Sequence, residues 1–427
     1  MKIMSIVGAR PNFMKVAPII SAINEHNDRL VADGSSAIQH ILIHTGQHYD
    51  ELMSDSFFTD LNLPKPNIHL GVGSGSHAIQ TAEIMRGFEG VLLQEAPDVL
   101  VVVGDVNSTL ACALVAAKIS FDASGKRPLI AHVEAGLRSF DRTMPEEINR
   151  ILTDQVSDLL FVTEESGLSN LVREGIVAET VHFVGNTMID SLLTFKKKAE
   201  ESCILEDLGL RKDMVNSGCS HSTTKYALLT LHRPGNVDRR DVFWNILEGL
   251  GNLAKEFPVI FPAHPRTQKR IQEFGLEHYF ESNHGQPQFG KSGRSRAIRM
   301  IDPLGYLDFL CLMKSACLVV TDSGGVQEET TCLGIPCVTV RENTERPVTI
   351  ESGTNMLAGT TKERVGAAIR RQMGRKDGNG IPQKWDGHAG TRIVDVLISA
   401  YYERTPSRQS ITPQPCVFRP MSTARES

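Results

Sequence analysis

Acidic side chains stand at the ends of two predicted buried strands of this chain. Asp105 follows the apolar run 100–103, and Glu134 follows the apolar run 130–133. A third acid, Glu146, comes directly after a proline that suits the first position of a helix. Open parallel sheets bind ligands at the carboxyl ends of their strands, and carboxylates held there can take or give a proton. The pattern therefore predicts acid–base chemistry on a bound ligand.

Each of these acids also has an interpretation that needs no ligand. Asp105 could cap the helix that is expected to begin near Asn107. Glu134 could form a structural ion pair with Arg138, and Glu146 could simply offset the positive end of its helix. The sequence alone leaves these alternatives open.

Two histidines also follow predicted strands. His232 comes after the run 228–231, His264 comes two residues after Pro262, and each has an arginine within two residues. A single histidine is more often structural than catalytic. Two of them at strand ends beside arginines favour a role in a site that binds an anion.

Two glycine-containing turns provide a place for phosphate. Segment 6–12, Ile-Val-Gly-Ala-Arg-Pro-Asn, and segment 318–325, Leu-Val-Val-Thr-Asp-Ser-Gly-Gly, each end a predicted strand and enter a predicted helix. Glycine lets the backbone approach a ligand closely, and a helix N-terminus presents unpaired N–H groups and a positive dipole end to an anion. We therefore expect a phosphorylated ligand between two domains.

Apolar, β-rich runs alternate along the chain with longer helical patterns, which is typical of parallel sheets covered by helices on both faces. The sequence predicts an α/β fold with two doubly wound domains, 1–186 and 187–375, and a polar hinge near 195–224. An exposed loop insertion is expected at 281–297 and a flexible tail at 404–427. The expected strands are 2–7, 39–44, 98–103, 128–133, 158–162, 180–184, 226–231, 257–261, 317–321 and 336–340.

Composition narrows the class of protein. With 41% hydrophobic and 22% charged residues the chain is expected to be globular, and a net charge of −5 argues against nucleic acid or anionic lipid as a partner. No apolar run reaches the roughly 20 residues needed to span a membrane, and the first apolar run is too short for a signal peptide. The eight cysteines include no Cys-x-x-Cys pair. We therefore predict a cytoplasmic protein without a metal site.

Seven motifs, taken in order, resemble those of the non-hydrolysing UDP-N-acetylglucosamine 2-epimerases. The resemblance covers about residues 1–375, and the ordered set is far more specific than any one string. The motifs are Gly-Ala-Arg-Pro-Asn-Phe-Met-Lys, His-Thr-Gly-Gln-His-Tyr-Asp, Gly-Asp-Val-Asn-Ser-Thr, His-Val-Glu-Ala-Gly-Leu-Arg-Ser, Pro-Glu-Glu-Ile-Asn-Arg, Asp-Ser-Gly-Gly-Val-Gln-Glu-Glu and Thr-Glu-Arg-Pro.

The resemblance implies two Rossmann-like domains of the glycosyltransferase-B type, a homodimer, and UDP in the interdomain active-site cleft. It also implies that a C-terminal segment, 376–403, returns to the first domain through a helix near 391–402. The family's catalytic acids match Asp105, Glu134 and Glu146, and its catalytic histidine matches His232. Its substrate-binding positions match Arg10, Lys15, Phe309, Ser323, Gly324, Gly325, Glu329 and Arg346.

The resemblance implies that the diphosphate would be held by Ser323, Gly324, Gly325 and Arg346. Arg10 and Lys15 would contact the diphosphate or the sugar. Glu329 would accept from the ribose hydroxyls, and Phe309 would stack on uracil, although Phe309 also fits a core position on a helix.

Epimerisation at C2 would proceed by elimination of UDP to a glycal and its re-addition, which needs acids and bases but no redox step. No cofactor is therefore predicted, and the string 71–76 lacks the last glycine of a dinucleotide motif. Alternatives from the sequence are an epimerase of a modified UDP-sugar of the diacetamido uronic acid type and a UDP-sugar-dependent glycosyltransferase on the same fold. A hydrolysing epimerase and a non-catalytic sensor of nucleotide sugars are also considered.

Overall fold

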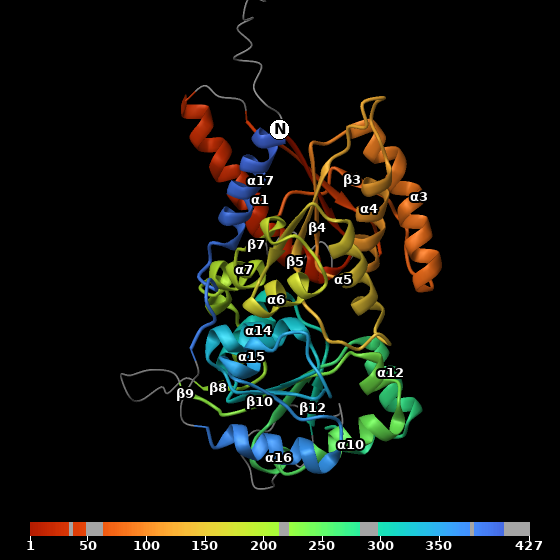
Figure 1. Ribbon diagram of the computed structural model, residues 1–427. Helices are drawn as coiled ribbons and strands as arrows, with labels where there is room; N and C mark the ends of the chain where they lie inside the picture. Colours follow the sequence, from red (N-terminus) through yellow and green to blue (C-terminus); the bar gives the residue numbers. More distant parts are fainter. Residues whose placement is uncertain (34–36, 48–62, 213–221, 282–297, 376–379, 405–427) are drawn as a thin grey trace, which may run out of the picture.

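The structure is a computed structural model that describes residues 1–33, 37–47, 63–212, 222–281, 298–375 and 380–404. The loop insertion expected at 281–297 and the tail expected at 404–427 lie, apart from their first residues, outside the described part of the chain. Two parallel sheets with helices packed on them make up the molecule (Figure 1). The predicted α/β class is confirmed.

The first sheet has seven parallel strands in the order β3-β2-β1-β4-β5-β6-β7. Its strands are β1 (Lys2–Val7), β2 (Gln39–His44), β3 (Ile68–His69), β4 (Val99–Val103), β5 (Leu129–Ala135), β6 (Leu159–Val162) and β7 (Val181–Phe183). Successive side chains of a strand point to opposite faces, so a strand that is apolar throughout must be covered on both sides. Accordingly, Val99 and Val101 of β4 pack with one apolar cluster, and Leu100 and Val102 pack with another.

Helices cover both faces of the first sheet. One cluster includes α1 (Arg10–Asp33) and α17 (Ala389–Arg404), and the other includes α3 (His77–Glu95) and α4 (Asn107–Lys118). Next to α4 lies α5 (Pro145–Val156), and α6 (Glu165–Arg173) follows β6. Figure 1 shows α17, in blue, alongside α1, in red. The C-terminal helix therefore packs against the first sheet and α1.

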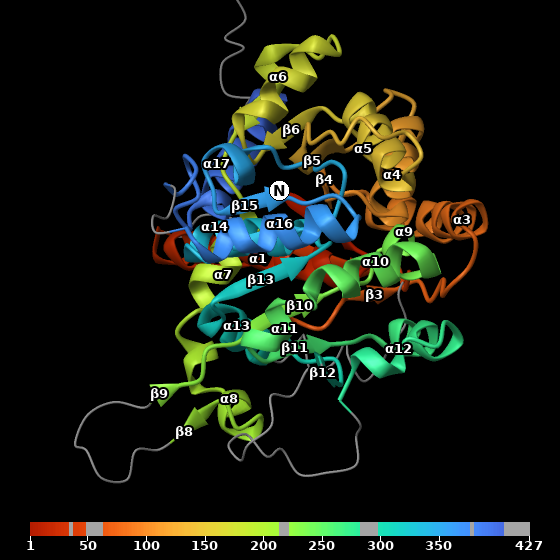
Figure 2. The same ribbon diagram turned by 90° about the horizontal axis from the view of Figure 1, so that it is seen from below.

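The second sheet has six parallel strands in the order β12-β11-β10-β13-β14-β15. Its strands are β10 (Ala227–Thr230), β11 (Val259–Pro262), β12 (Ile298–Ile301), β13 (Leu318–Thr321), β14 (Cys337–Thr339) and β15 (Asn355–Leu357). Its helices are α9 (Pro234–Val237), α10 (Arg240–Leu250), α11 (Leu253–Glu256), α12 (Pro265–Glu273), α13 (Tyr306–Ser315), α14 (Gly324–Leu333), α15 (Val348–Glu351) and α16 (Lys362–Met373). Figure 2 shows α10 and α16 on one side of this sheet.

The stretch between the sheets begins with α7 (Thr187–Phe195), which packs on both α1 and α14. The polar stretch 195–224, expected to be a hinge, contains α8 (Ile204–Asp207) and the short strands β8 (Arg211–Lys212) and β9 (Ser222–Thr223). Leu205, Leu208 and Leu210 are buried, and α8 packs on α13. The described part of this stretch is thus attached to the second sheet, and the division of domains at 186 stays a prediction.

Candidate active site

Asp105 lies where β4 ends and is held by an arginine from α5. Gly104 turns the chain with φ +68°, and the Asp105 carboxylate then accepts a hydrogen bond from Arg150. Arg150 is 2% exposed, whereas Asp105 is 24% exposed. The cap position of α4 belongs to Val106, which makes no side-chain cap bond. The interpretation of Asp105 as a helix cap is therefore wrong.

The electrostatic surroundings keep Asp105 ionised. Burial raises the pKa of Asp105, but the positive charges of Arg150, Lys15 and Arg346 together outweigh burial, and the pKa lies below its usual value. A partly exposed carboxylate that is ionised is in the protonation state that a general base requires.

Glu134 is held by cations from both halves of the chain. Its carboxylate pairs with Lys15 of α1 and with Arg346, whose Nη2 lies 2.6 Å from Oε1. Its φ of +72° is a left-handed conformation that glutamate seldom adopts, and the pairing of β5 with β6 shifts register at this point. Such a conformation persists only where its surroundings fix it.

The alternative interpretation of Glu134, a structural ion pair with Arg138, is wrong. Arg138 instead contacts Asp154 and Glu174, with an Nη2–oxygen distance of 2.7 Å to each. Glu134 therefore pairs with Lys15 and Arg346 rather than with Arg138.

Arg346 links the two halves of the site. It is buried and pairs with Glu134, with Glu345, and with Glu328 of α14 at 2.9 Å. Burial lowers the pKa of Arg346, but these carboxylates outweigh it and raise the pKa well above the usual value. The guanidinium is thus a fixed positive charge with a forked set of donors, the kind of group that binds phosphate oxygens.

The N-terminus of α14 lies against this guanidinium. Ser323 is the cap residue and makes no side-chain cap bond. A Cβ added to Gly324 would lie 2.5 Å from Nη1 of Arg346 and 2.8 Å from Oε1 of Glu345, whereas one added to Gly325 would lie 3.4 Å from Cε of Met188. The absence of a side chain at Gly324 therefore leaves room for the Arg346 guanidinium beside the start of α14.

We predict that Gly324→Ala lowers the free energy of unfolding by about 1–3 kcal/mol, because the added methyl displaces the buried ion pairs. Gly325→Ala is the matched control and is expected to cost under about 1 kcal/mol, because the tip of Met188 can move. Urea unfolding of both variants measures this. Equal losses for the two variants would contradict the packing argument.

His232 lies at the end of β10, and its ring is oriented by Asp322. Its Nδ1 is 2.9 Å from Oδ1 of Asp322, and its side chain is 55% exposed. Asp322 is fully buried and also accepts from the backbone N–H groups of His232 and Arg233 and from Asn236. Burial raises the pKa of Asp322, but His232 and these donors outweigh it and lower the pKa. Sequence reasoning missed Asp322, although it precedes the Ser-Gly-Gly turn directly.

Two other predicted positions are close to this region. Glu329 is buried and accepts a hydrogen bond from Tyr306 at 3.1 Å, which joins α14 to α13. Phe309, on α13, is partly buried against the apolar cluster shared by these helices. Tyr306 was not predicted.

The remaining predicted residues divide into three kinds. Glu146 is half-buried in the first turn of α5, and its neighbour Glu147 is the buried one. Arg10 begins α1, and its side chain is outside the description. His264 is exposed, and its Nδ1 accepts from the N–H of Arg266 at the start of α12.

Glu164 is a buried acid whose carboxyl interacts with the charges of Glu328 and Arg346. Burial raises its pKa to about 7, the effect of Glu328 adds to this, and a hydrogen bond from Ser166 opposes it. Because the folded state then binds the proton more tightly than the unfolded state, the carboxyl destabilises the fold progressively as pH rises from about 4.5 to 7.

We predict that Glu164→Gln raises the free energy of unfolding at pH 8, by at most about 3 kcal/mol, and gives no gain at pH 4. The neighbouring exposed Glu165→Gln is the control and is expected to show no such dependence on pH. Denaturant unfolding at the two pH values measures it. The same increment at both pH values would count against the assignment.

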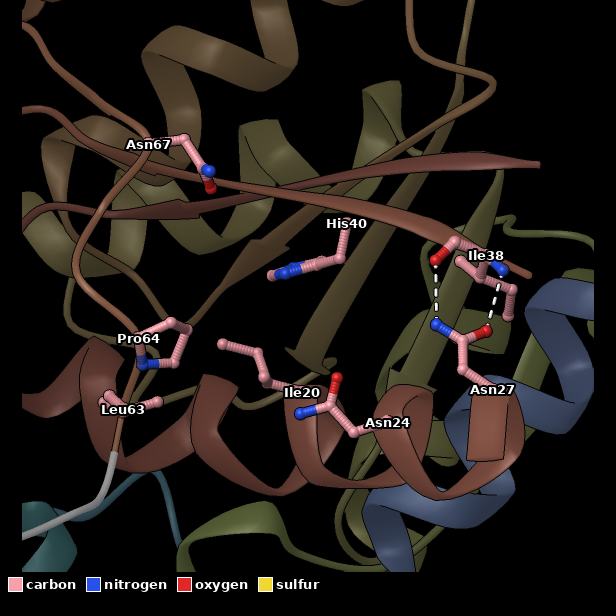
Figure 3. A pocket seen from close by; sticks show the side chains of 8 residues that line it. All are labelled: Ile20, Asn24, Asn27, Ile38, His40, Leu63, Pro64 and Asn67. Carbon is pink, nitrogen blue, oxygen red and sulfur yellow. Dashed lines mark hydrogen bonds between the residues drawn. The ribbon is translucent and has the colours of Figure 1, made fainter. Parts of the chain in front are cut away.

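A separate cavity of about 510 Å³ lies between α1 and β2 (Figure 3). Its lining includes His40, whose ring accepts or donates a bond to Ser5 at 2.9 Å and whose pKa burial lowers to about 4. None of the predicted site residues lines this cavity: its lining is Ile20, Asn24, Asn27, Ile38, His40, Leu63, Pro64 and Asn67.

The fold and the site define a class: two α/β domains, each built on a parallel sheet, with strand-end acids on one and a helix N-terminus beside a buried arginine on the other. Comparison with known proteins agrees. A family model described as UDP-N-acetylglucosamine 2-epimerase matches residues 32–398. No helix in the described ranges is long and apolar enough to cross a membrane.

Relatives match over almost their whole length. A UDP-N-acetylglucosamine 2-epimerase of Methanocaldococcus jannaschii is 44% identical over 94% of this chain and 100% of its own. A crystal structure of UDP-GlcNAc 2-epimerase from the same organism, in complex with UDP-GlcNAc and UDP, is 43% identical in sequence and has a TM-score of 0.79. The match covers 93% of this chain and 100% of that one. A UDP-2,3-diacetamido-2,3-dideoxy-D-glucuronate 2-epimerase of Pseudomonas aeruginosa is 37% identical over 93% of this chain and 99% of its own.

This chain therefore belongs to the UDP-N-acetylglucosamine 2-epimerase family. The family predicted from its motifs is confirmed, as is the glycosyltransferase-B type of architecture.

Proposed function

We propose that this protein is an isomerase that interconverts UDP-N-acetylglucosamine and UDP-N-acetylmannosamine, by elimination of UDP to a glycal, return of a proton to the opposite face of C2 and re-addition of UDP at C1. The observation that carries the proposal is the joint position of Asp105 and Glu134, two strand-end carboxylates held beside Lys15 and Arg346. The likeness over the whole chain to proteins named for this activity supports it.

The chemistry explains why such a site needs both signs of charge. The proton at C2 is hardly acidic, so the bond between C1 and the diphosphate oxygen must break first and leave positive character at C1. A carboxylate then removes the C2 proton to give the glycal. Return of a proton to the other face of C2 and of UDP to C1 completes the inversion.

Asp105, Glu134 and Glu146 would exchange protons with the sugar. His232 and Arg346 would stabilise the negative charge on the departing diphosphate, together with Ser323, Gly324 and Gly325 at the start of α14. Lys15 and Arg10 would lie on the sugar side of the diphosphate. Glu329 would accept from the ribose hydroxyls and Phe309 would stack on uracil.

No cofactor is part of this route, because the substrate is neither oxidised nor reduced overall. A second candidate substrate is a diacetamido uronic acid derivative of UDP, since a relative named for that sugar is 37% identical to this chain. A glycosyltransferase activity has less support, because it does not require this group of acids at the strand ends.

We further propose that the protein acts as a homodimer in the cytoplasm. The outer side of α3 exposes Ile79 by 63% and Leu93 by 48%, which a second copy would cover. The cysteines that the structure describes are all free thiols, as expected in a reducing compartment. Size-exclusion chromatography with light scattering, on the wild type and on Leu93→Glu, tests the dimer.

Incubation with UDP-N-acetylglucosamine in deuterated buffer tests the activity. We expect the manno epimer to appear and both epimers to acquire deuterium at C2, with no free sugar. Exchange only with the diacetamido uronic acid derivative would identify the second substrate. Absence of exchange with either sugar would reject the proposal.

A further inference from the structure

His132 is a fully buried histidine in the middle of β5, and both of its ring nitrogens have partners. Nδ1 lies 2.6 Å from Oδ1 of Asp154, which is on α5. Nε2 lies 2.8 Å from the backbone carbonyl of Gly104, at the end of the neighbouring strand β4. Figure 1 shows α5 beside these two strands.

The two ring nitrogens of His132 therefore contact oxygen atoms on two different elements, one on α5 and one at the end of β4. Asp154 also pairs with Arg138, and Arg138 in turn pairs with Glu174. These contacts join His132 and Asp154 into one connected set of side chains.

The backbone groups that contact His132 and Asp154 belong to the two turns that carry the proposed catalytic acids, Asp105 and Glu134. Gly104 directly precedes Asp105, and its own N–H donates to the carbonyl of Val133, the residue before Glu134. The other oxygen of Asp154 accepts from the N–H of Gly136, two residues after Glu134. Glu134 and Gly136 have φ values of +72° and +77°, so this turn needs fixing from outside.

We infer that His132 and Asp154 are positioning residues for the epimerisation proposed above: they brace the Asp105 turn against the Glu134 turn and so fix the spacing of the two acids. The inference rests on that proposed function. Both residues are fully buried, and each contacts a backbone group close to a proposed acid. A shift of about 1 Å in a reacting group can cost about 10²-fold in rate.

Two substitutions separate the two bonds of the ring. The amide nitrogen of Asn can replace Nδ1 of His, so His132→Asn keeps a donor toward Asp154 and loses the bond to Gly104. The amide nitrogen of Gln can replace Nε2, so His132→Gln keeps the bond to Gly104 and loses the one to Asp154. Asp154→Asn is a third variant, which keeps the size of the side chain but removes the negative charge that pairs with Arg138.

We expect His132→Asn to lower kcat for C2 exchange by about 10²-fold, with KM for UDP-N-acetylglucosamine and Kd for UDP within about twofold of the wild type. His132→Gln should keep at least one tenth of the wild-type kcat. The kcat of Asp154→Asn should lie between those of the two His132 variants. KM and Kd should change less than kcat because UDP is expected to bind mainly to α14 and Arg346, which these residues do not touch.

Tyr226→Phe is the matched control, because Tyr226 is also fully buried and its hydroxyl donates to the carbonyl of Leu312 at 2.6 Å, away from both acids. It should lose a comparable amount of stability and keep its kcat. Unchanged kcat in His132→Asn, or equal loss in kcat and UDP affinity in all variants, would overturn the inference. If His132→Asn does not fold, Asp154→Asn decides by the same measurements. Absence of exchange in the wild type would reject the proposed function instead.

Discussion

Replacement of Asp105 by Asn is expected to lower kcat for epimerisation by about 10²–10⁴-fold, the usual contribution of a well-placed acid or base. The amide cannot accept a proton at neutral pH. Its oxygen can still accept from Arg150, which also keeps Glu147 as a partner, so the fold should survive. The rate of deuterium exchange at C2 in the presence of saturating UDP-sugar measures the effect.

Asp158→Asn is the control: it makes the same change of side chain, at an acid that lies at the opposite end of the strands of the first sheet. Asp158 forms a two-bond pair with Arg127, with both N–O distances 2.7 Å, and accepts from the backbone N–H of Ile130. This variant should lose stability and keep its kcat. An Asp105→Asn enzyme with more than a tenth of the wild-type exchange rate would remove Asp105 from the proposed mechanism.

Much of the fold was predictable because the strands of a doubly covered sheet are apolar throughout. The ten expected strands all exist, within two residues at either end of each, and β5 runs two residues further than expected, through Glu134 to Ala135. The strands that were missed are short or polar. β3 has two residues, β8 and β9 form a small separate antiparallel pair, β12 reads Ile-Arg-Met-Ile after a polar insertion, and β15 has three residues.

The acids of the site were predictable from their positions after strands, but their partners were not. Glu147, Arg150 and Asp154 are spaced i, i+3, i+7 on α5, which places them on one face of the helix, and all three are buried. Such a charged face on an otherwise amphipathic helix was a signal in the sequence. Its interpretation needed the knowledge that this face meets the ends of β4 and β5 rather than solvent.

The contacts between the two sheets could not be predicted from local sequence, since they join residues far apart in the chain. Arg346 reaches Glu134 across 212 positions, Asn186 donates to Glu328 at 2.9 Å, and the Ser191 hydroxyl donates to the carbonyl of Met14 at 2.6 Å. These buried polar contacts fix one placement of the domains more than they add stability, because desolvation offsets most of their electrostatic energy. A site with parts on both domains depends on that placement.

Glu147→Gln is expected to lower the free energy of unfolding by about 3–5 kcal/mol, because it leaves a buried guanidinium short of its counter-charge. The Glu147 carboxylate is 1% exposed and accepts from the backbone N–H groups of Ser139 and Phe140 and from two nitrogens of Arg150. Burial raises the pKa of Glu147, but these donors outweigh it and lower the pKa. Its contribution to stability is therefore present above about pH 4.5 and is lost as pH falls through the lowered pKa.

The neighbouring Glu146→Gln is the natural comparison for Glu147→Gln, because Glu146 is half-buried in the same turn of α5. Its free energy of unfolding should lie within about 0.5 kcal/mol of the wild type, and its kcat should fall by about 10²-fold or more if Glu146 exchanges protons with the sugar as proposed. Urea unfolding at pH 7 and pH 4, with C2 exchange at pH 7, separates the two. If Glu147→Gln were as stable as the wild type, or Glu146→Gln as active, the division of roles between these adjacent acids would be wrong.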